Sequence, residues 1–313
     1  MDPRIIFFGT PEFAVPSLEA LIAAGYKPLA VVTQPAAPVG RHAKPTESAV
    51  ARAAHKHAIP VQTPDSIKSK EFISWLREQK PDVALLVAYG KILPEPVLAV
   101  PKLGFVNVHP SLLPNYRGAS PIAGALLNGE TQTGVSIMRL DAQMDHGPIL
   151  AQQTIDIASD ATMGSLSKSL ADLGATLLIK TLPDFLSGNN QGEPQDHSQA
   201  TVTKLLKRSD GELDWSRSAI ELERQVRAFT PWPGTFTYLG GVRLKILAAQ
   251  IGADAPVDNA SKPGALTLEG ERLFIQTGAG QLEILRVQLA GKKPQNVGEF
   301  IHGQPRLRGA TVG

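Results

Sequence analysis

The sequence of 313 residues contains no cysteine. This absence excludes disulfide bonds, a thiol nucleophile and every zinc site that depends on cysteine. The sequence also lacks any apolar run near the roughly 20 residues that a membrane-spanning helix requires. Its first residues have no cleavage-site pattern, and we interpret the apolar run at residues 4–8 as a strand rather than part of a signal peptide. The sequence therefore predicts a soluble, cytoplasmic protein without a membrane segment.

A dinucleotide-binding fingerprint is also missing. Residues 4–8 are followed by Gly9, Thr10 and Pro11, without the G-x-G-x-x-G spacing. A helical pattern to about residue 24 and a second apolar run at residues 29–33 complete a strand–helix–strand order, which is typical of a parallel sheet. The sequence thus predicts an α/β fold, with a Rossmann-like, mostly parallel sheet flanked by helices, but no nicotinamide cofactor.

The second half of the chain has a different character. Residues 187–201 are polar, contain glycine and lack hydrophobic periodicity, as is typical of a linker. Beyond them, short strand-like runs alternate with glycine turns, which indicates a small, OB-like β-barrel. We therefore predict an N-terminal catalytic domain (1–188), a linker (189–205) and a C-terminal barrel (206–313). Residues 201–313 hold 15 basic and 11 acidic side chains, which suits a polyanionic partner but also scattered surface lysines.

The stretch at residues 104–121, GFVNVHPSLLPNYRGASP, contains the main candidate site. At the strand period of two, Asn107 and His109 point to the same face, and Pro110 ends the ladder because it has no N–H to donate. Ligands of open α/β sheets bind at the carboxyl ends of strands. Two polar side chains at such an end predict a binding or catalytic site, although core polar groups with satisfied hydrogen bonds would show the same pattern.

Two loops carry further candidates. Residues 141–148, DAQMDHGP, lie between two expected strands and contain Asp145 and His146. These are either surface turn residues or a carboxylate directed at Asn107 and His109, and sequence spacing does not decide between the two. Residues 34–45 form a proline-rich loop with Arg41, which either contacts phosphates or is a plain surface excursion.

The residue types argue against two other kinds of site. Asn107 is a poor ligand for the usual transition metals, and no second histidine lies close to His109 in the sequence, so no metal is expected. Ser111 follows His109 by two residues and does not lie in a G-x-S-x-G elbow, which disfavours a Ser-His-Asp hydrolase.

Several stretches resemble the folate-dependent formyltransferases. They are FGTPEFAVP near the start, NVHPSLLPNYRGASPI in the middle and MDHGPIL after it. GELDWSRSA (211–219) and VRAFTPWPGTFT (226–237) are similar to the second domain of the methionyl-tRNA formyltransferases. The resemblance covers nearly the whole chain. It implies transfer of the formyl group of 10-formyltetrahydrofolate to the α-amine of methionine on initiator Met-tRNA, by a monomer that needs no metal.

The resemblance also implies roles for particular residues. The catalytic residues would be Asn107, His109 and Asp145. The loop next to the folate would be Ser111, Leu112, Leu113 and Pro114, and the backbone of residues 86–92 would line the pterin. Arg41 would bind the tRNA. Formyl transfer suits these residue types. Asn107 and His109 offer N–H donors to an oxyanion. Asp145 can accept a proton from the amine or hold His109 in the protonation state that the reaction needs.

The sequence departs from the family pattern in one loop. The residues after Gly40 and Arg41 read HAKPTESAVA, which is less basic than the family leads us to expect. Contacts with tRNA would then shift to C-terminal cations such as Lys204, Lys207 and Arg208. Aromatic residues make up only 5% of the chain, so contacts with the RNA backbone are favoured over stacking on bases. Two alternatives remain, a formyltransferase acting on a small amine and an RNA-binding protein without activity.

Overall fold

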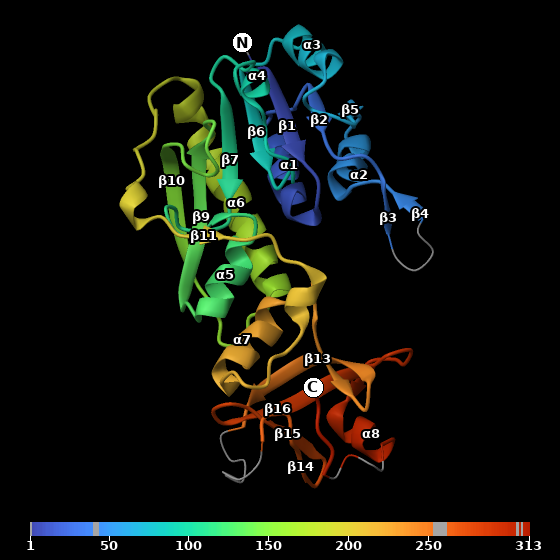
Figure 1. Cartoon of the computed structure of the whole chain (residues 1–313). Coiled ribbons are helices and arrows are strands. Elements are labelled where there is room, and N and C mark those ends of the chain that lie inside the picture. The colour runs from blue at the N-terminus through green and yellow to red at the C-terminus, as the bar shows by residue number, and fades with distance from the viewer. Residues whose placement is uncertain (1, 40–43, 253–261, 305–306, 308) are drawn as a thin grey trace. The chain divides into compact units, whose positions relative to one another are not determined.

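The computed structural model describes residues 2–39, 44–252, 262–304, 307 and 309–313 (Figure 1). The chain divides into two compact units, and each unit has its own main sheet. The units alternate along the sequence. The first comprises Met1–Pro121, Gln132–Asp156 and Ser167–Thr203, and the second comprises Ile122–Thr131, Ile157–Leu166 and Lys204–Gly313.

The first unit is built around a seven-stranded sheet. Its strands are β1 (Ile5–Gly9), β2 (Ala30–Val32), β5 (Val61–Gln62), β6 (Val83–Val87), β7 (Phe105–His109), β9 (Gln132–Arg139) and β10 (Ile149–Asp156). They lie in the order β10-β9-β7-β6-β1-β2-β5. The five strands from β7 to β5 are parallel, whereas β9 runs antiparallel to β7 and β10 antiparallel to β9. The mostly parallel sheet predicted from the sequence is confirmed.

The order of the strands reverses between β1 and β6. From β1 the chain first builds β2 and β5 on one side, and then β6 and β7 on the other. In α/β proteins, ligands bind beyond the carboxyl ends of the strands at such a switch point. The loops that follow β1 and β6 meet there, because the Thr10 hydroxyl donates to the Tyr89 carbonyl at 3.0 Å. The strand with Asn107 and His109, β7, is the neighbour of β6.

The two faces of β7 have different neighbours. The helix α6 (Met163–Leu186) packs against Val108, and a Cβ atom at Gly174 would lie 2.6 Å from the Val108 Cγ1. Glycine therefore permits the close approach of this helix. Because side chains alternate along a strand, Asn107 and His109 share the opposite face with Phe105. Phe105 packs on Phe8, with 5.2 Å between the ring centroids.

The other helices of the first unit begin at serine or aspartate caps or at prolines. The Ser48 and Ser69 hydroxyls accept hydrogen bonds from Ala51 N and Phe72 N, at 3.0 and 3.2 Å, which satisfies free N–H groups of the first turns. These helices are η1 (Glu12–Ala14), α1 (Val15–Ala23), α2 (Ala49–Lys56), α3 (Lys70–Glu78), α4 (Glu95–Leu98) and η2 (His197–Gln199).

Among the helices that the structure describes, none combines the length and the apolar character that a membrane span requires.

The segment at residues 34–45 differs from the predicted plain loop. Within it, β3 (Ala37–Val39) pairs antiparallel with β4 (Lys44–Thr46), and Pro38 stands opposite Pro45. Proline is tolerated here because each strand of a two-stranded ribbon has a free edge, which needs no N–H donor. Arg41 lies outside the described residues.

The segment predicted as a linker packs on the first unit up to Thr203. Its strand β11 (Val202–Thr203) pairs in parallel with β8 (Arg117–Gly118). The side chain of Gln195 is buried. Contacts of this kind were not expected from the polar composition, since composition says nothing about which side chains find a buried partner.

The second unit contains an antiparallel sheet in the order β12-β13-β16-β15-β14, with β17 added to β16. Residues near the C-terminus join its two outer strands, since Val312 bridges Leu239 on β12 and Thr311 bridges Ala265 beside β14. This segment closes the sheet, which confirms the small barrel predicted from the sequence. The strands are β12 (Thr235–Leu239), β13 (Val242–Ile251), β14 (Leu266–Glu269), β15 (Arg272–Gln276), β16 (Gln281–Leu289) and β17 (Gln295–Asn296).

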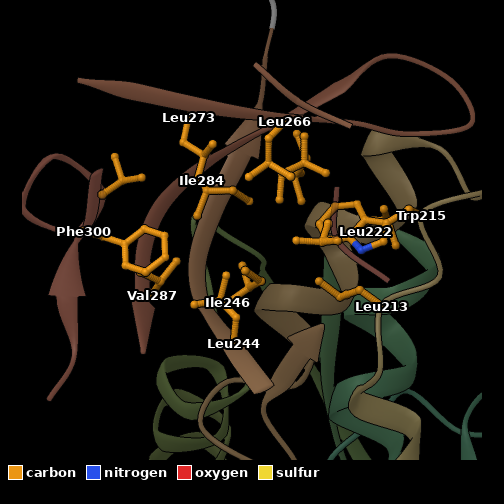
Figure 2. Packing of buried hydrophobic residues seen from close by; sticks show 14 of the residues in the cluster. Leu213, Trp215, Leu222, Leu244, Ile246, Leu266, Leu273, Ile284, Val287 and Phe300 are labelled. Carbon is orange, nitrogen blue, oxygen red and sulfur yellow. The ribbon is translucent and has the colours of Figure 1, made fainter. Parts of the chain in front are cut away.

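Apolar side chains from the strands and two helices fill the barrel (Figure 2). Leu222 enters from the helix α7 (Ala219–Ala228), and Phe300 enters from α8 (Val297–His302). Trp215 is buried and donates its indole N–H to the Thr237 hydroxyl at 3.0 Å. This bond satisfies the polar atom that the large ring takes into the core. The helix α5 (Pro121–Asn128) and the short η3 (Arg208–Gly211) complete the second unit.

Replacing Phe8 tests the core beneath the candidate site. Phe8 is fully buried and packs edge-on against Tyr89, Phe105 and Phe72. We expect Phe8→Ala to lower the free energy of unfolding by about 3–5 kcal/mol, because it loses apolar burial and leaves a cavity. Ile92→Ala is the control, because Ile92 is 75% exposed and its loss should cost within about 0.5 kcal/mol. Urea denaturation of the full chain measures both, and equal midpoints would contradict this account of the core.

Candidate functional site

Two buried polar side chains mark the carboxyl end of β7. Asn107 and His109 are only 5% and 4% exposed. The strand lies between β6 and β9, with Asn107 opposite Leu86 on one side and Met138 on the other. Because both neighbours are fixed by ladder hydrogen bonds, the positions of the two side chains are set by the sheet rather than by a loop.

The Asn107 side-chain amide makes no hydrogen bond to any residue in the described ranges. The polar atoms of this amide are not fully enclosed, so they keep a small opening to solvent. A buried amide normally has its hydrogen bonds satisfied, because leaving one unmade costs about 1–3 kcal/mol. The free amide is therefore available to a bound molecule.

His109 is held in one tautomer. Its Nε2 lies 3.0 Å from the Tyr116 carbonyl, and because a carbonyl can only accept, Nε2 carries the proton. The burial of the ring lowers the pKa of His109 below its usual value of 6.5, although the charge of Asp145 and the bond to Tyr116 act in the opposite direction. The ring is accordingly neutral at pH 7, with an unprotonated Nδ1.

Asp145 faces that unprotonated nitrogen. Its Oδ1 lies 3.7 Å from His109 Nδ1, and its Oδ2 accepts a hydrogen bond from Gly118 N at 2.8 Å. A separation of 3.7 Å is too long for a direct hydrogen bond. Two acceptors that face each other at this distance can share an incoming proton, directly or through a water molecule. The structure thus brings Asp145 to His109, although the two are far apart in the sequence.

Gly118 supplies its N–H from a conformation that favours glycine. Its φ is +99°, and a Cβ atom there would lie 2.5 Å from the Thr203 carbonyl oxygen. Thr203 also donates its hydroxyl to the Arg117 carbonyl at 3.0 Å, and that hydroxyl accepts from Ser120 N at 3.0 Å. The pairing of β8 with β11 therefore aims the Gly118 amide at Asp145.

The loop after β7 is braced by the neighbouring antiparallel strands. Leu113 N donates to the Ser136 hydroxyl at 3.0 Å, and that hydroxyl donates to the Ser111 carbonyl at 2.7 Å. Gln152 Nε2 donates to the Leu113 carbonyl at 2.8 Å. Of the four residues expected near the folate, Ser111 and Leu113 are buried, whereas Leu112 and Pro114 are partly exposed. Only the latter two offer side-chain surface to a ligand.

The backbone after β6 is shaped at the switch point of the sheet. The Tyr89 carbonyl accepts from the Thr10 hydroxyl at 3.0 Å and from Gln34 Nε2 at 2.8 Å. Ala88 and Gly90 adopt φ values of +47° and +84°. This stretch, residues 86–92, therefore follows an irregular path next to the strand that carries Asn107.

The sequence did not predict two buried residues next to the site. Arg117 and Gln195 are 8% and 6% exposed, and Arg117 donates to Gln195 Oε1 from both Nε and Nη2, at 3.2 and 2.6 Å. Arg117 lies within the NYRGASP stretch, which offered a hint, but Gln195 lies in the predicted linker and offered none. His146 is turned to Asp141, with 2.6 Å between Nδ1 and Oδ2. The described residues hold no group of three or more side chains able to bind a metal ion.

Family models match both parts of the chain. A model described as "Formyl transferase" matches residues 3–182, and one described as "Formyl transferase, C-terminal domain" matches residues 205–305.

Relatives with assigned names are similar over their whole length. A methionyl-tRNA formyltransferase of Chloroflexus aggregans is 47% identical over 303 residues, which covers 96% of this chain and 97% of that protein. Those of Roseiflexus castenholzii and Methylococcus capsulatus are 45% and 44% identical, and the matches cover at least 99% of both chains in each case.

Solved structures share the fold at lower identity. An N-formyltransferase of Helicobacter canadensis in complex with folinic acid and dTDP-3-aminofucose has a TM-score of 0.65 at 19% identity, with 90% of this chain and 98% of that chain covered. HypX of Aquifex aeolicus in complex with tetrahydrofolic acid has a TM-score of 0.64 at 16% identity, with 98% and 48% covered. Since the family models span both parts and the relatives match end to end, the chain belongs to the formyl transferase family, among the methionyl-tRNA formyltransferases.

Proposed function

We propose that this protein transfers the formyl group of 10-formyltetrahydrofolate to the α-amine of methionine on initiator Met-tRNA, which gives N-formylmethionyl-tRNA for translation initiation. The observation that carries the proposal is the identity of 42–47% with methionyl-tRNA formyltransferases over almost the entire chain. The site geometry agrees with it, because an amide without a partner among the described residues lies on the same strand face as a histidine that faces a carboxylate.

In the proposed reaction, the neutral amine attacks the formyl carbon, and a tetrahedral intermediate with a negatively charged oxygen forms. The bond from the formyl carbon to N10 then breaks, and N10 takes up a proton. Asn107 donates an N–H to the oxygen as its charge develops. This assignment is supported by the unused amide, since a donor fixed in advance stabilises the transition state without reorganisation.

His109 and Asp145 accept the proton that the amine loses. The expectation from the family that His109 also gives an N–H to the oxyanion needs a ring nitrogen that is free to donate. In the structure Nε2–H is already bonded to the Tyr116 carbonyl, and Nδ1 lacks a proton. We therefore assign the pair first to accepting a proton from the amine and returning it to N10. Once protonated, Nδ1 becomes a donor in its turn.

The co-substrate would lie along the loop after β7 and the backbone after β6. Leu112 and Pro114 offer partly exposed apolar surface, while Ser111 and Leu113 hold the loop from within. The backbone of residues 86–92 is proposed to line the pterin. The reaction as written requires no metal.

The remaining assignments concern the tRNA and the organisation of the chain. We propose residues 1–188 as the catalytic domain, 189–205 as the linker and 206–313 as the tRNA-binding domain, with Arg41 as a further tRNA contact. The family models, which match residues 3–182 and 205–305, support this division. We also propose that the protein acts as a monomer, as the family resemblance implies, and we infer a cytoplasmic location from the tRNA substrate.

A direct assay tests the function. Purified protein is incubated with 10-formyltetrahydrofolate and either charged initiator tRNA or small amines, namely an amino sugar nucleotide and a purine precursor. We expect formylation of Met-tRNA only. Transfer to a small amine with none to Met-tRNA would reject the proposal, and stable tRNA binding without any turnover would identify an RNA-binding protein instead.

Replacing Asn107 tests the oxyanion role. We expect Asn107→Ala to lower kcat by about 10²–10³ while the KM values change little, because the lost donor acts mainly in the transition state. Asn115→Ala is the matched control, since Asn115 is an exposed asparagine of the neighbouring loop and its loss should leave kcat unchanged. Steady-state kinetics on both variants provides the comparison, and normal turnover by Asn107→Ala would remove this residue from the mechanism.

A titration of His109 tests the proton site. Because burial lowers its pKa, the folded protein should keep His109 neutral until the pH falls below 6.5, and the protonated form should then destabilise the fold. The charge of Asp145 acts to raise this pKa, so Asp145→Asn should move the midpoint to still lower pH. Nitrogen NMR of labelled histidine measures both midpoints. A midpoint above 6.5, or an upward shift in the variant, would show that burial does not dominate.

A further inference from the structure

The backbone of the turn that carries Asp145 must be held in place by residues from other segments. Asp145 has a φ of +50°, in the left-handed region that residues with a Cβ enter at a cost. The turn is largely open to solvent on one side, where Met144 is 53% exposed. A carboxylate on such a turn keeps a fixed position next to His109 only if other groups hold the backbone.

Gln195 holds this backbone. Its Nε2 donates two hydrogen bonds, one to the Asp145 carbonyl at 2.9 Å and one to the Gly147 carbonyl at 2.7 Å. The two bonds use both N–H groups of the amide. They tie the backbone at the carbonyl of Asp145 itself and at the carbonyl two residues further on, so the chain that leaves the left-handed residue is fixed. The side chain that does this comes from the segment after α6, 50 residues away from Asp145 in the sequence.

Arg117 fixes the orientation of the Gln195 amide. Its guanidinium donates to Oε1 through Nε and Nη2. A guanidinium has no acceptor, so the amide oxygen must face Arg117 and the amide nitrogen must face the two carbonyls. Arg117 Nη2 also lies 2.8 Å from His197 Nδ1, which anchors the guanidinium from a second side. The amide of Gln195 therefore cannot flip without breaking all four of its hydrogen bonds.

We propose that Gln195 is a positioning residue for formyl transfer, which acts through Asp145. The inference rests on the proposed function, since it takes Asp145 as part of the proton-accepting pair. Gln195 does not touch the reacting atoms. It sets where the Asp145 carboxylate stands relative to His109 Nδ1, and Arg117 in turn sets Gln195. Within the segment that follows α6, Gln195 is accordingly the residue that positions the Asp145 carboxylate.

The isosteric change Gln195→Glu tests this role. It keeps the shape and an acceptor for Arg117, but it removes both donors and sets a carboxylate against two carbonyl oxygens. We expect kcat to fall by about 10–100-fold, since a displacement of about 1 Å can cost 10²-fold, while the KM values stay near those of the wild type. Gln199→Glu is the control, because it makes the same charge change at an exposed position of the same segment and should leave kcat unaltered.

A double-mutant cycle separates positioning from a general structural effect. If Gln195 acts through Asp145, Gln195→Glu should cause little further loss of single-turnover rate in an Asp145→Asn background. A full additional loss there would overturn the proposal. So would a Gln195→Glu enzyme with the kcat of the control.

A second variant covers the case in which Gln195→Glu fails to fold. Gln195→Asn adds no charge but is one methylene shorter, so it cannot reach both carbonyls and should show an intermediate loss of kcat. A wild-type kcat in this variant would overturn the proposal as well. Failure of the proposed function looks different, because the wild-type protein itself would then not formylate Met-tRNA.

Discussion

The hydrogen bond from Gly118 N to Asp145 Oδ2 is the contact on which the arrangement of the site depends. It occupies one carboxylate oxygen and thereby leaves the other to face His109. The bond exists only because Gly118 adopts a φ of +99°, which brings its backbone against Thr203. The strand β7 with the loop after it and the segment at Thr203, which are distant in the sequence, thus converge on one carboxylate. The sheet supplies His109, the loop after it supplies the amide, and the segment before the barrel braces that loop.

Burial gives this arrangement its chemical character. His109 is neutral because burial of the ring lowers its pKa, and its only proton is committed to the Tyr116 carbonyl. The site is consequently prepared to receive a proton and not to deliver one first. This order suits an amine nucleophile, which becomes acidic only after it has begun to attack. Asn107 needs no such preparation, since its amide is neutral at every pH of interest and needs only to be left unpaired.

Much of the fold and part of the site could be predicted from the sequence. The period of two placed Asn107 and His109 on one face, and the strand–helix–strand order indicated the parallel sheet. Local patterns could not place Asp145, because its approach to His109 depends on a turn held by Gln195 from a polar segment without periodicity. The hydrogen bonds of Gln195 to that turn were missed for the same reason. The sequence does not distinguish a buried glutamine that makes four hydrogen bonds from a glutamine exposed to solvent.

The alternation of the two units along the chain has a consequence for fragments of this protein. The C-terminal unit includes residues 122–131 and 157–166. Asn128 accepts a hydrogen bond from Arg224, and Ala161 accepts one from Arg227. A gene fragment that encodes only residues 204–313 would omit both of these partners. A fragment that starts at residue 204 would therefore leave the guanidinium groups of Arg224 and Arg227 without acceptors that they use inside their own unit.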